Sequence, residues 1–307
     1  MHNRREFLLA AAAAAATTGL ANDAAATGVM VRDIDLATQD PARALPVRLF
    51  MPPAGRHLPL ALFSHGAYSS GRLYDPILRH WAAAGFAVLA PTHRDSVSLG
   101  VKRGSNDPRY FSWRLEDMEF LVASLDEVRR QAPDFSNRVD PTRLAATGHS
   151  FGGLVAQTLA GATYFDPASG KTIDRAVKNV RAAIVFSGAG RFAPLLRTED
   201  FAALKLPLLV TVGTEDLQQA PGLTGYQWRR EPFDLAAGKP KYLLTLQGAD
   251  HYLGGMVGRD DLPQAAQGPA WLTTFNRTCE YFLRRHVAGK RVAMPDIADG
   301  TGHLERA

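Results

Sequence analysis

Five residues, Gly148-His149-Ser150-Phe151-Gly152, constrain the fold of this chain more than any other segment. The apolar run 144–147 before them is typical of a buried strand, and the run 154–162 after them is typical of a helix. A serine on so sharp a strand-to-helix turn projects its hydroxyl above the edge of a sheet, and the glycines leave room for the turn. The first amides of the helix favour negative charge at the same place. The pattern also fits an ordinary loop serine, but its surroundings favour a nucleophile.

An acid and a histidine follow the serine, each just after another apolar run. A serine hydroxyl needs a base to become nucleophilic, and we expect His251 to be that base and later the acid that protonates the leaving group. Asp216 is expected to orient the imidazole. It is preferred to the rival carboxylates Glu215 and Asp250 because it lies further past the end of its strand. The alternative for His251 is an ordinary solvated loop histidine. The two apolar runs are 206–212 and 242–246.

Backbone donors for an oxyanion are expected beside the serine. One is the amide of Phe151, the residue after the nucleophile, and the other lies in the loop after an early strand. The run Leu58 to Phe63 has the composition of that strand, and His65-Gly66 follows it. Because glycine lets the chain turn back closely, the Ala67 N–H is predicted to point at the site. The alternative is that His65-Gly66 is a simple turn that ends the strand.

With these segments in place, the chain resembles an α/β-hydrolase, and more narrowly the dienelactone-hydrolase-like and platelet-activating-factor-acetylhydrolase-like esterases. The resemblance covers about residues 45–287. It implies a triad of Ser150, Asp216 and His251, with the Ala67 and Phe151 amides as the oxyanion hole. True dienelactone hydrolases carry a cysteine nucleophile, so the serine here favours ordinary carboxylic esters as substrates. The matching segments are Phe63-Ser64-His65-Gly66, Ala90-Pro91-Thr92-His93-Arg94-Asp95, Val139-Asp140-Pro141-Thr142-Arg143-Leu144, Gly148 to Gly153, Gly213 to Asp216 and Gly248 to His251.

Strand-like and helix-like segments alternate along the rest of the chain. Strands are predicted at 46–51, 86–90 and 182–186, and helices at 75–84, 112–130 and 271–287. This alternation predicts an α/β fold of the α/β-hydrolase type, with a mainly parallel central sheet and helices on both faces. The segment 188–205 is too short for a large cap domain. We expect one catalytic domain over 27–290, followed by a loose C-terminal tail over 291–307.

The N-terminus predicts export. Asn3-Arg4-Arg5-Glu6-Phe7-Leu8 matches a twin-arginine signature, and a short alanine-rich apolar run follows it. Small residues over 21–26 offer a cleavage site. We therefore expect residues 1–26 to be a removed signal peptide and the enzyme to be periplasmic or secreted, without stable membrane insertion. An uncleaved anchor is the alternative.

Composition excludes several classes of function. The net charge of +5 is spread along the chain without a lysine-rich tract, so nucleic acid is not an expected partner. The one cysteine, Cys279, lies in the last predicted helix and is expected to be a buried, inert thiol. Without a cysteine–histidine cluster, no metal or other cofactor is expected.

The expected activity is hydrolysis of carboxylic esters by a serine hydrolase through an acyl-enzyme. A small-molecule or polymeric ester is the predicted substrate, and the sequence does not specify the acyl chain or the oligomeric state. The alternatives are an amidase or peptidase with the same triad, and an inactive binding protein of the same fold. Residues predicted to contact substrate, or else to be ordinary core, are Tyr68, His149, Tyr252 and Leu253.

Overall fold

A computed structural model describes residues 28–40, 43–217 and 225–307. The expected signal peptide, residues 1–26, lies outside the described residues. A nine-stranded sheet in the order β1-β2-β4-β3-β5-β8-β9-β10-β11 forms the centre of the molecule. Its strands are β1 (Met30–Ala37), β2 (Ala44–Met51), β3 (Leu58–Ser64), β4 (Ala87–Pro91), β5 (Val139–His149), β8 (Val180–Phe186), β9 (Leu208–Gly213), β10 (Lys241–Leu246) and β11 (Gly302–Arg306).

The six strands in the middle of the sheet, from β4 to β10, are parallel to one another, while β1, β2 and β11 run antiparallel to their neighbours. Parallel strands that are covered on both faces are apolar along their whole length. All seven residues of β3 and all six of β9 are buried. The predicted α/β fold with a mainly parallel sheet is therefore confirmed.

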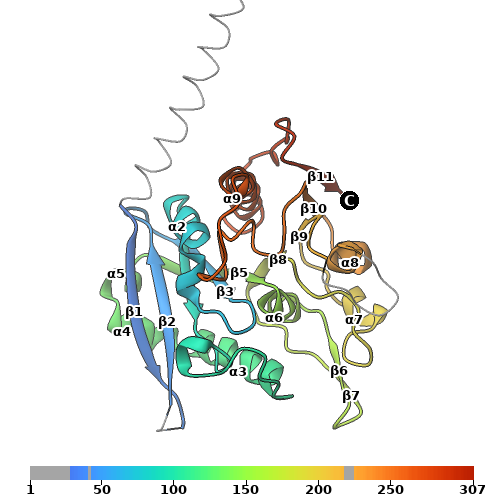
Figure 1. The fold of residues 1–307 in the computed structure, drawn as a ribbon. Helices are drawn as coiled ribbons and strands as arrows, with labels where there is room; N and C mark the ends of the chain where they lie inside the picture. The colour runs from blue at the N-terminus through green and yellow to red at the C-terminus, as the bar shows by residue number, and fades with distance from the viewer. Residues whose placement is uncertain (1–27, 41–42, 218–224) are drawn as a thin grey trace, which may run out of the picture.

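Helices cover both faces of the sheet (Figure 1). Helices α2 (Asp75–Ala83) and α9 (Gly268–His286) lie on one face, and α3 (Tyr110–Ala123), α6 (Phe151–Leu159) and α8 (Gln227–Leu235) lie on the other. Each face has its own hydrophobic core: Trp81 and Phe282 belong to one, and Leu115 and Leu154 to the other. The shorter elements are η1 (Gly71–Tyr74), η2 (Val97–Leu99), α4 (Leu125–Gln131), α5 (Pro133–Ser136), α7 (Thr198–Ala202) and the hairpin of β6 (Tyr164–Asp166) and β7 (Lys171–Ile173).

The helix predicted over 112–130 is two helices. Ser124, at φ −98° and ψ +16°, separates α3 from α4. Serine is a weak helix former because its hydroxyl competes for backbone hydrogen bonds. The apolar spacing continues across the break, and Leu125 and Val128 stay in the same core as Leu115, which is why periodicity alone did not reveal it.

The prediction of a loose tail over 291–307 is wrong for its last residues. β11 pairs with β10 and extends the sheet by one antiparallel strand, and Leu304 is buried there. A short edge strand carries few apolar residues, so its sequence resembles a polar tail. The first strand, β1, and the β6–β7 hairpin were also not predicted.

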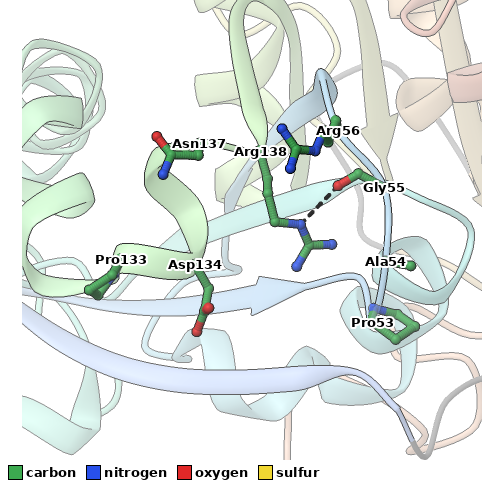
Figure 2. Close-up of a pocket in the computed structure, with 8 residues that line it drawn as sticks. All are labelled: Pro53, Ala54, Gly55, Arg56, Pro133, Asp134, Asn137 and Arg138. Carbon is green, nitrogen blue, oxygen red and sulfur yellow. Dashed lines mark hydrogen bonds between the residues drawn. The ribbon is translucent and has the colours of Figure 1, made fainter.

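The segment between β8 and β9 contains only the short helix α7, and no separate cap domain is present within the described residues. None of the described helices is both long enough and apolar enough to pass through a bilayer. An open pocket of about 480 Å³ lies where the loops before β3 and β5 meet, with Arg138 donating a hydrogen bond to the Gly55 carbonyl (Figure 2). Those loops precede their strands, whereas Ser150 follows β5. The pocket and Ser150 therefore lie at opposite ends of the parallel strands.

Candidate active site

Ser150 occupies a strained turn between β5 and α6. Its backbone has φ +55° and ψ −118°, a region that side chains with a Cβ rarely adopt. The Ser150 N–H donates to the Phe186 carbonyl at the end of β8, at 2.8 Å. A Cβ on Gly152 would collide with the Ser64 carbonyl oxygen, so the second glycine of the motif is needed for the turn to pack against β3. The turn is thus held by both neighbouring strands.

The structure brings the predicted base and acid together. His251 Nδ1 lies 2.8 Å from Asp216 Oδ2, and their side chains are 16% and 1% exposed. The two loops are joined by a hydrogen bond from the Glu215 N–H to the Ala249 carbonyl at 2.9 Å. Burial disfavours the charged carboxylate, but the hydrogen bond from His251 and the charges of His251 and Arg229 outweigh it and lower the pKa of Asp216 to about 2.

The two rival carboxylates point elsewhere. Glu215 is exposed at the surface. Asp250 accepts hydrogen bonds from the backbone N–H groups of Tyr252, at 3.0 Å, and Gly254, at 2.6 Å, and so shapes the loop that carries the histidine. Of the three acids considered, Asp216 is the one bonded to His251.

His149 lies between the serine turn and the histidine loop. Its ring centroid is 4.6 Å from that of His251, and its Nε2–H donates to the His251 carbonyl at 2.9 Å. Ser150, the next residue, makes no side-chain hydrogen bond to His251 or to another described residue. In enzymes without substrate such bonds are often long and tighten only when substrate is present.

The same histidine links these loops to the loop after β3. Because Nε2 donates, Nδ1 of the neutral ring accepts, and the Tyr74 hydroxyl donates to it at 2.6 Å. The Tyr74 oxygen in turn accepts from the Gly66 N–H at 3.0 Å. Burial and the charge of His251 hold the pKa of His149 well below its usual value, so the ring stays neutral and the chain of hydrogen bonds keeps one direction.

Neither expected oxyanion donor is engaged by a residue that the structure describes. The backbone N–H groups of Ala67 and Phe151 donate no hydrogen bond to any described residue. A Cβ on Gly66 would lie 2.9 Å from the Tyr74 hydroxyl and 3.0 Å from His149 Nδ1, so glycine is required for the loop to approach this closely. Both amides are therefore available to an oxygen atom beside Ser150.

Arg114 of α3 supports the loop after β3, which carries Gly66 and Ala67. It is buried, donates to the carbonyls of His65 and Gly66, and its guanidinium lies 4.5 Å from the ring centroid of Phe151. Asp95 accepts two hydrogen bonds from it, at 2.9 and 2.7 Å, and a third from the Tyr68 N–H at 3.3 Å. Burial opposes ionisation of Asp95, but the charge and hydrogen bonds of Arg114 lower its pKa to about 2.

Two neutral histidines complete this buried network. The His93 ring lies between the Ser64 hydroxyl, at 2.9 Å, and Asp117, at 3.0 Å, and the backbone N–H of His93 donates to His65 Nε2 at 2.9 Å. Burial and the charge of Arg114 lower the pKa of both rings. His93 and Asp95 belong to the segment 90–95, one of those on which the family resemblance rests.

Arg114 and Arg229 were not predicted. Arg229 Nε lies 3.5 Å from Asp216 Oδ1, and its Nη1 donates to the Ser187 carbonyl at 2.7 Å. Both arginines are on amphipathic helices, where an arginine is normally an exposed residue, and no spacing in the sequence relates them to the site.

The four residues predicted to contact substrate fall into two groups. Tyr68 and Tyr252 are partly exposed, and Tyr68 lines a pocket next to Ala67. His149 and Leu253 are 0% and 1% exposed. For these two the structure corrects the prediction. The His149 ring lies between the serine turn and the His251 loop, with both ring nitrogens engaged, and Leu253 belongs to the core under α9.

No cluster of metal-ligating side chains occurs in the part of the chain that the structure describes. Cys279 is fully buried, and burial raises the pKa of its thiol well above its usual value.

Comparison with known proteins agrees with this geometry at the level of the family. A search of curated proteins found no match. The family model described as the alpha/beta hydrolase family matches residues 61–307, which include every site residue discussed above. The match covers most of the chain, and its range contains the strained serine turn and the bonded Asp216–His251 pair. The chain belongs to the α/β-hydrolase family and has its fold.

Proposed function

We propose that this hydrolase cleaves carboxylic esters through an acyl-enzyme, with Ser150 as nucleophile, His251 as base and Asp216 as the acid that orients it. The observation that carries the proposal is the 2.8 Å bond between His251 and the buried, ionised Asp216, on loops joined to each other and adjoining the strained Ser150 turn. One fold hosts many activities, so the geometry of the site, not the fold, supports this activity.

The first half-reaction forms the acyl-enzyme. Ser150 Oγ attacks the ester carbonyl carbon as His251 Nε2 takes its proton, and the carbonyl oxygen becomes an oxyanion that accepts from the Ala67 and Phe151 N–H groups. Collapse of this intermediate breaks the bond to the alcohol oxygen, which receives the proton from His251. In the second half-reaction, water attacks the acyl carbonyl carbon as His251 takes its proton. Collapse of this second intermediate breaks the bond to Ser150 Oγ, which receives the proton from His251, and the acid is released.

Asp216 contributes by electrostatics and orientation. Its carboxylate accepts the His251 Nδ1–H, which leaves Nε2 free to act as base, and it stabilises the imidazolium that forms in each half-reaction. Arg229 is close enough, at 3.5 Å, to keep Asp216 ionised. Its positive charge is itself held by the Ser187 carbonyl.

Purified protein is to be assayed with p-nitrophenyl esters and with anilides of the same acids. We expect ester turnover that falls by at least about 10³-fold in Ser150→Ala and in His251→Gln. A fluorophosphonate probe should label the parent protein and leave Ser150→Ala unlabelled. Faster turnover of the anilides would identify an amidase instead, and absence of labelling together with absence of turnover would indicate an inactive binding protein.

We also propose a relationship to the dienelactone-hydrolase-like and platelet-activating-factor-acetylhydrolase-like esterases, supported by the segments around His93, Asp140 and Ser150.

Export by the twin-arginine route to the periplasm or medium is proposed from Arg4-Arg5 and the apolar run after them. Replacing both arginines by lysine is expected to retain the full-length protein in the cytoplasm. Unchanged export of that variant would contradict the proposal.

A further inference from the structure

A pocket of about 380 Å³ begins at the two expected oxyanion donors. Ala67 and Phe151 both line it, together with the loop 105–108, the start of α3 and the loop 189–196. Its walls are mainly apolar and rich in aromatic rings, among them Tyr68, Phe111, Phe192 and Trp228.

The position of the pocket selects one half of an ester. The leaving alcohol must face His251, which gives it a proton. No residue of the His251 loop, 247–262, lines this pocket, and Asp216 does not either. A group that enters it from a carbonyl held by Ala67 and Phe151 therefore points away from His251, as the acyl group does.

The walls are built so that the space remains open. The Trp228 Nε1–H donates to the Arg191 carbonyl at 2.8 Å, and the Tyr68 hydroxyl donates to the Ser105 carbonyl at 2.6 Å. Phe111 packs edge-on against Tyr164, with ring centroids 5.0 Å apart. Because these polar atoms are already bonded within the protein, the surface offered to a ligand is mainly apolar.

We infer that this pocket makes the protein specific for neutral esters with a bulky apolar acyl group, of about six to eight carbon atoms, over acetyl esters. The inference rests on the proposed function. An acetyl group leaves most of the pocket to water, whereas each further buried methylene group improves binding in the transition state. Phe192, 55% exposed at the mouth of the pocket, supplies the outer contact for such a chain.

The test compares acyl series with one leaving group. With p-nitrophenyl acetate, butanoate, octanoate and benzoate, kcat/KM is expected to rise by at least about 10-fold from acetate to octanoate and benzoate. Esters of one acid with alcohols of increasing length should differ by less than about 3-fold. A flat acyl series, or a dependence on the alcohol in its place, would overturn the inference.

A filling substitution gives a second readout. Ala189 lines the pocket and bears no catalytic group, so Ala189→Trp should lower the octanoate-to-acetate ratio of kcat/KM by at least about 10-fold. The control is Ala54→Trp, in the pocket at the opposite end of the parallel strands (Figure 2), which should leave that ratio and the activity unchanged. An unchanged ratio in Ala189→Trp would contradict the assignment of the pocket.

The acyl pocket and the esterase activity can be refuted separately. Ester hydrolysis that depends on Ser150 but ignores acyl size refutes the acyl pocket and leaves the esterase proposal in place. Loss of all Ser150-dependent ester hydrolysis refutes the esterase proposal, and the acyl specificity with it.

Discussion

At the scale of single residues, the position of one carboxylate decides how His251 can act. Asp216 is buried and bonded to Nδ1, whereas Glu215, its neighbour, is exposed. An imidazole whose Nδ1–H is fixed in this way presents Nε2 as the base. Adjacent residues of one loop thus differ: the Asp216 side chain is directed at His251, and the Glu215 side chain is directed into solvent.

Asp216→Asn should lower kcat by about 10³- to 10⁴-fold, because the amide stabilises neither the required tautomer nor the imidazolium. The loss should persist from pH 5 to 9, since the pKa of Asp216 is about 2 and the carboxylate of the parent protein stays ionised throughout. Steady-state kinetics across this range is the measurement. Glu215→Gln is the matched control and should keep parent activity; a large loss there would contradict the assignment of the acid.

Tyr74 serves two hydrogen bonds at once, as acceptor from the Gly66 N–H and donor to His149. Tyr74→Phe removes both in a fully buried position, so we expect a loss of about 1–3 kcal/mol in the free energy of unfolding. The loop that carries Ala67 also loses its support, and kcat should fall by about 10-fold or more. Urea denaturation and initial rates measure the two effects.

Tyr242→Phe separates stability from catalysis in that experiment. Tyr242 is also buried, and its hydroxyl lies 3.3 Å from His286, at the opposite end of β10 from the catalytic loops. Tyr242→Phe should lower the free energy of unfolding and leave kcat unchanged. Equal kcat in Tyr74→Phe and the parent protein would refute the role given to the Tyr74 hydroxyl.

At the scale of elements, α3 supports the loop after β3 through a single side chain. Arg114 reaches two consecutive carbonyls, stacks on Phe151 and pairs with Asp95. These contacts connect both expected oxyanion donors to one helix. A guanidinium can make several bonds in fixed directions, whereas an ammonium is a point charge.

Arg114→Lys is therefore expected to keep Asp95 paired but to release the loop. We predict a fall in kcat of at least about 10-fold with a smaller change in KM, because the donors act mainly on the oxyanion and less on the bound ester. Arg175→Lys, which alters a pair with Glu119 on the same helix, is the control and should leave kcat unchanged. A rise in KM alone in Arg114→Lys would show that the arginine does not position the donors.

At the scale of the whole molecule, three histidines are fully buried and neutral around the site: His65, His93 and His149. In each, one ring nitrogen donates to a carbonyl or carboxylate and the other accepts from a donor, so protonation would break a hydrogen bond. Burial is the largest cause that lowers their pKa values. The centre of the fold is thus built around neutral imidazoles.

The free energy of unfolding is expected to fall as the pH drops from about 7 to 5. Below the unfolded histidine pKa of about 6.5, the unfolded chain takes up protons that the folded chain does not, so stability declines by up to about 1.4 kcal/mol per pH unit for each histidine. The paired Asp95 and Asp216, with pKa values of about 2, lose their contribution only below about pH 4.

Urea denaturation at several pH values measures this slope. His93→Gln should reduce the dependence of the free energy of unfolding on pH by up to the contribution of one histidine. His303→Gln, at an exposed position, is the control, and its pH dependence should equal that of the parent protein. Stability that is constant from pH 7 to 5 would contradict the neutral state of these rings.

The α/β fold and the order of serine, acid and histidine follow from the amino-acid sequence alone. Central parallel strands are buried on both faces, so they appear as unbroken apolar runs, and each side chain expected at the site directly follows one of them. The strained serine turn is local as well, because its glycines and its serine lie within five residues.

The residues that support those side chains are known only from the packing of the chain in three dimensions. The contacts of Arg114 with His65 and Gly66 and of Tyr74 with His149 join segments far apart along the chain, and the contact of Arg229 with Asp216 joins a helix to a loop. The same holds for the pairing of β11 with β10 and for the acyl pocket. Such contacts depend on how helices and loops pack in three dimensions, and a buried arginine or an edge strand has the same local sequence as an exposed one.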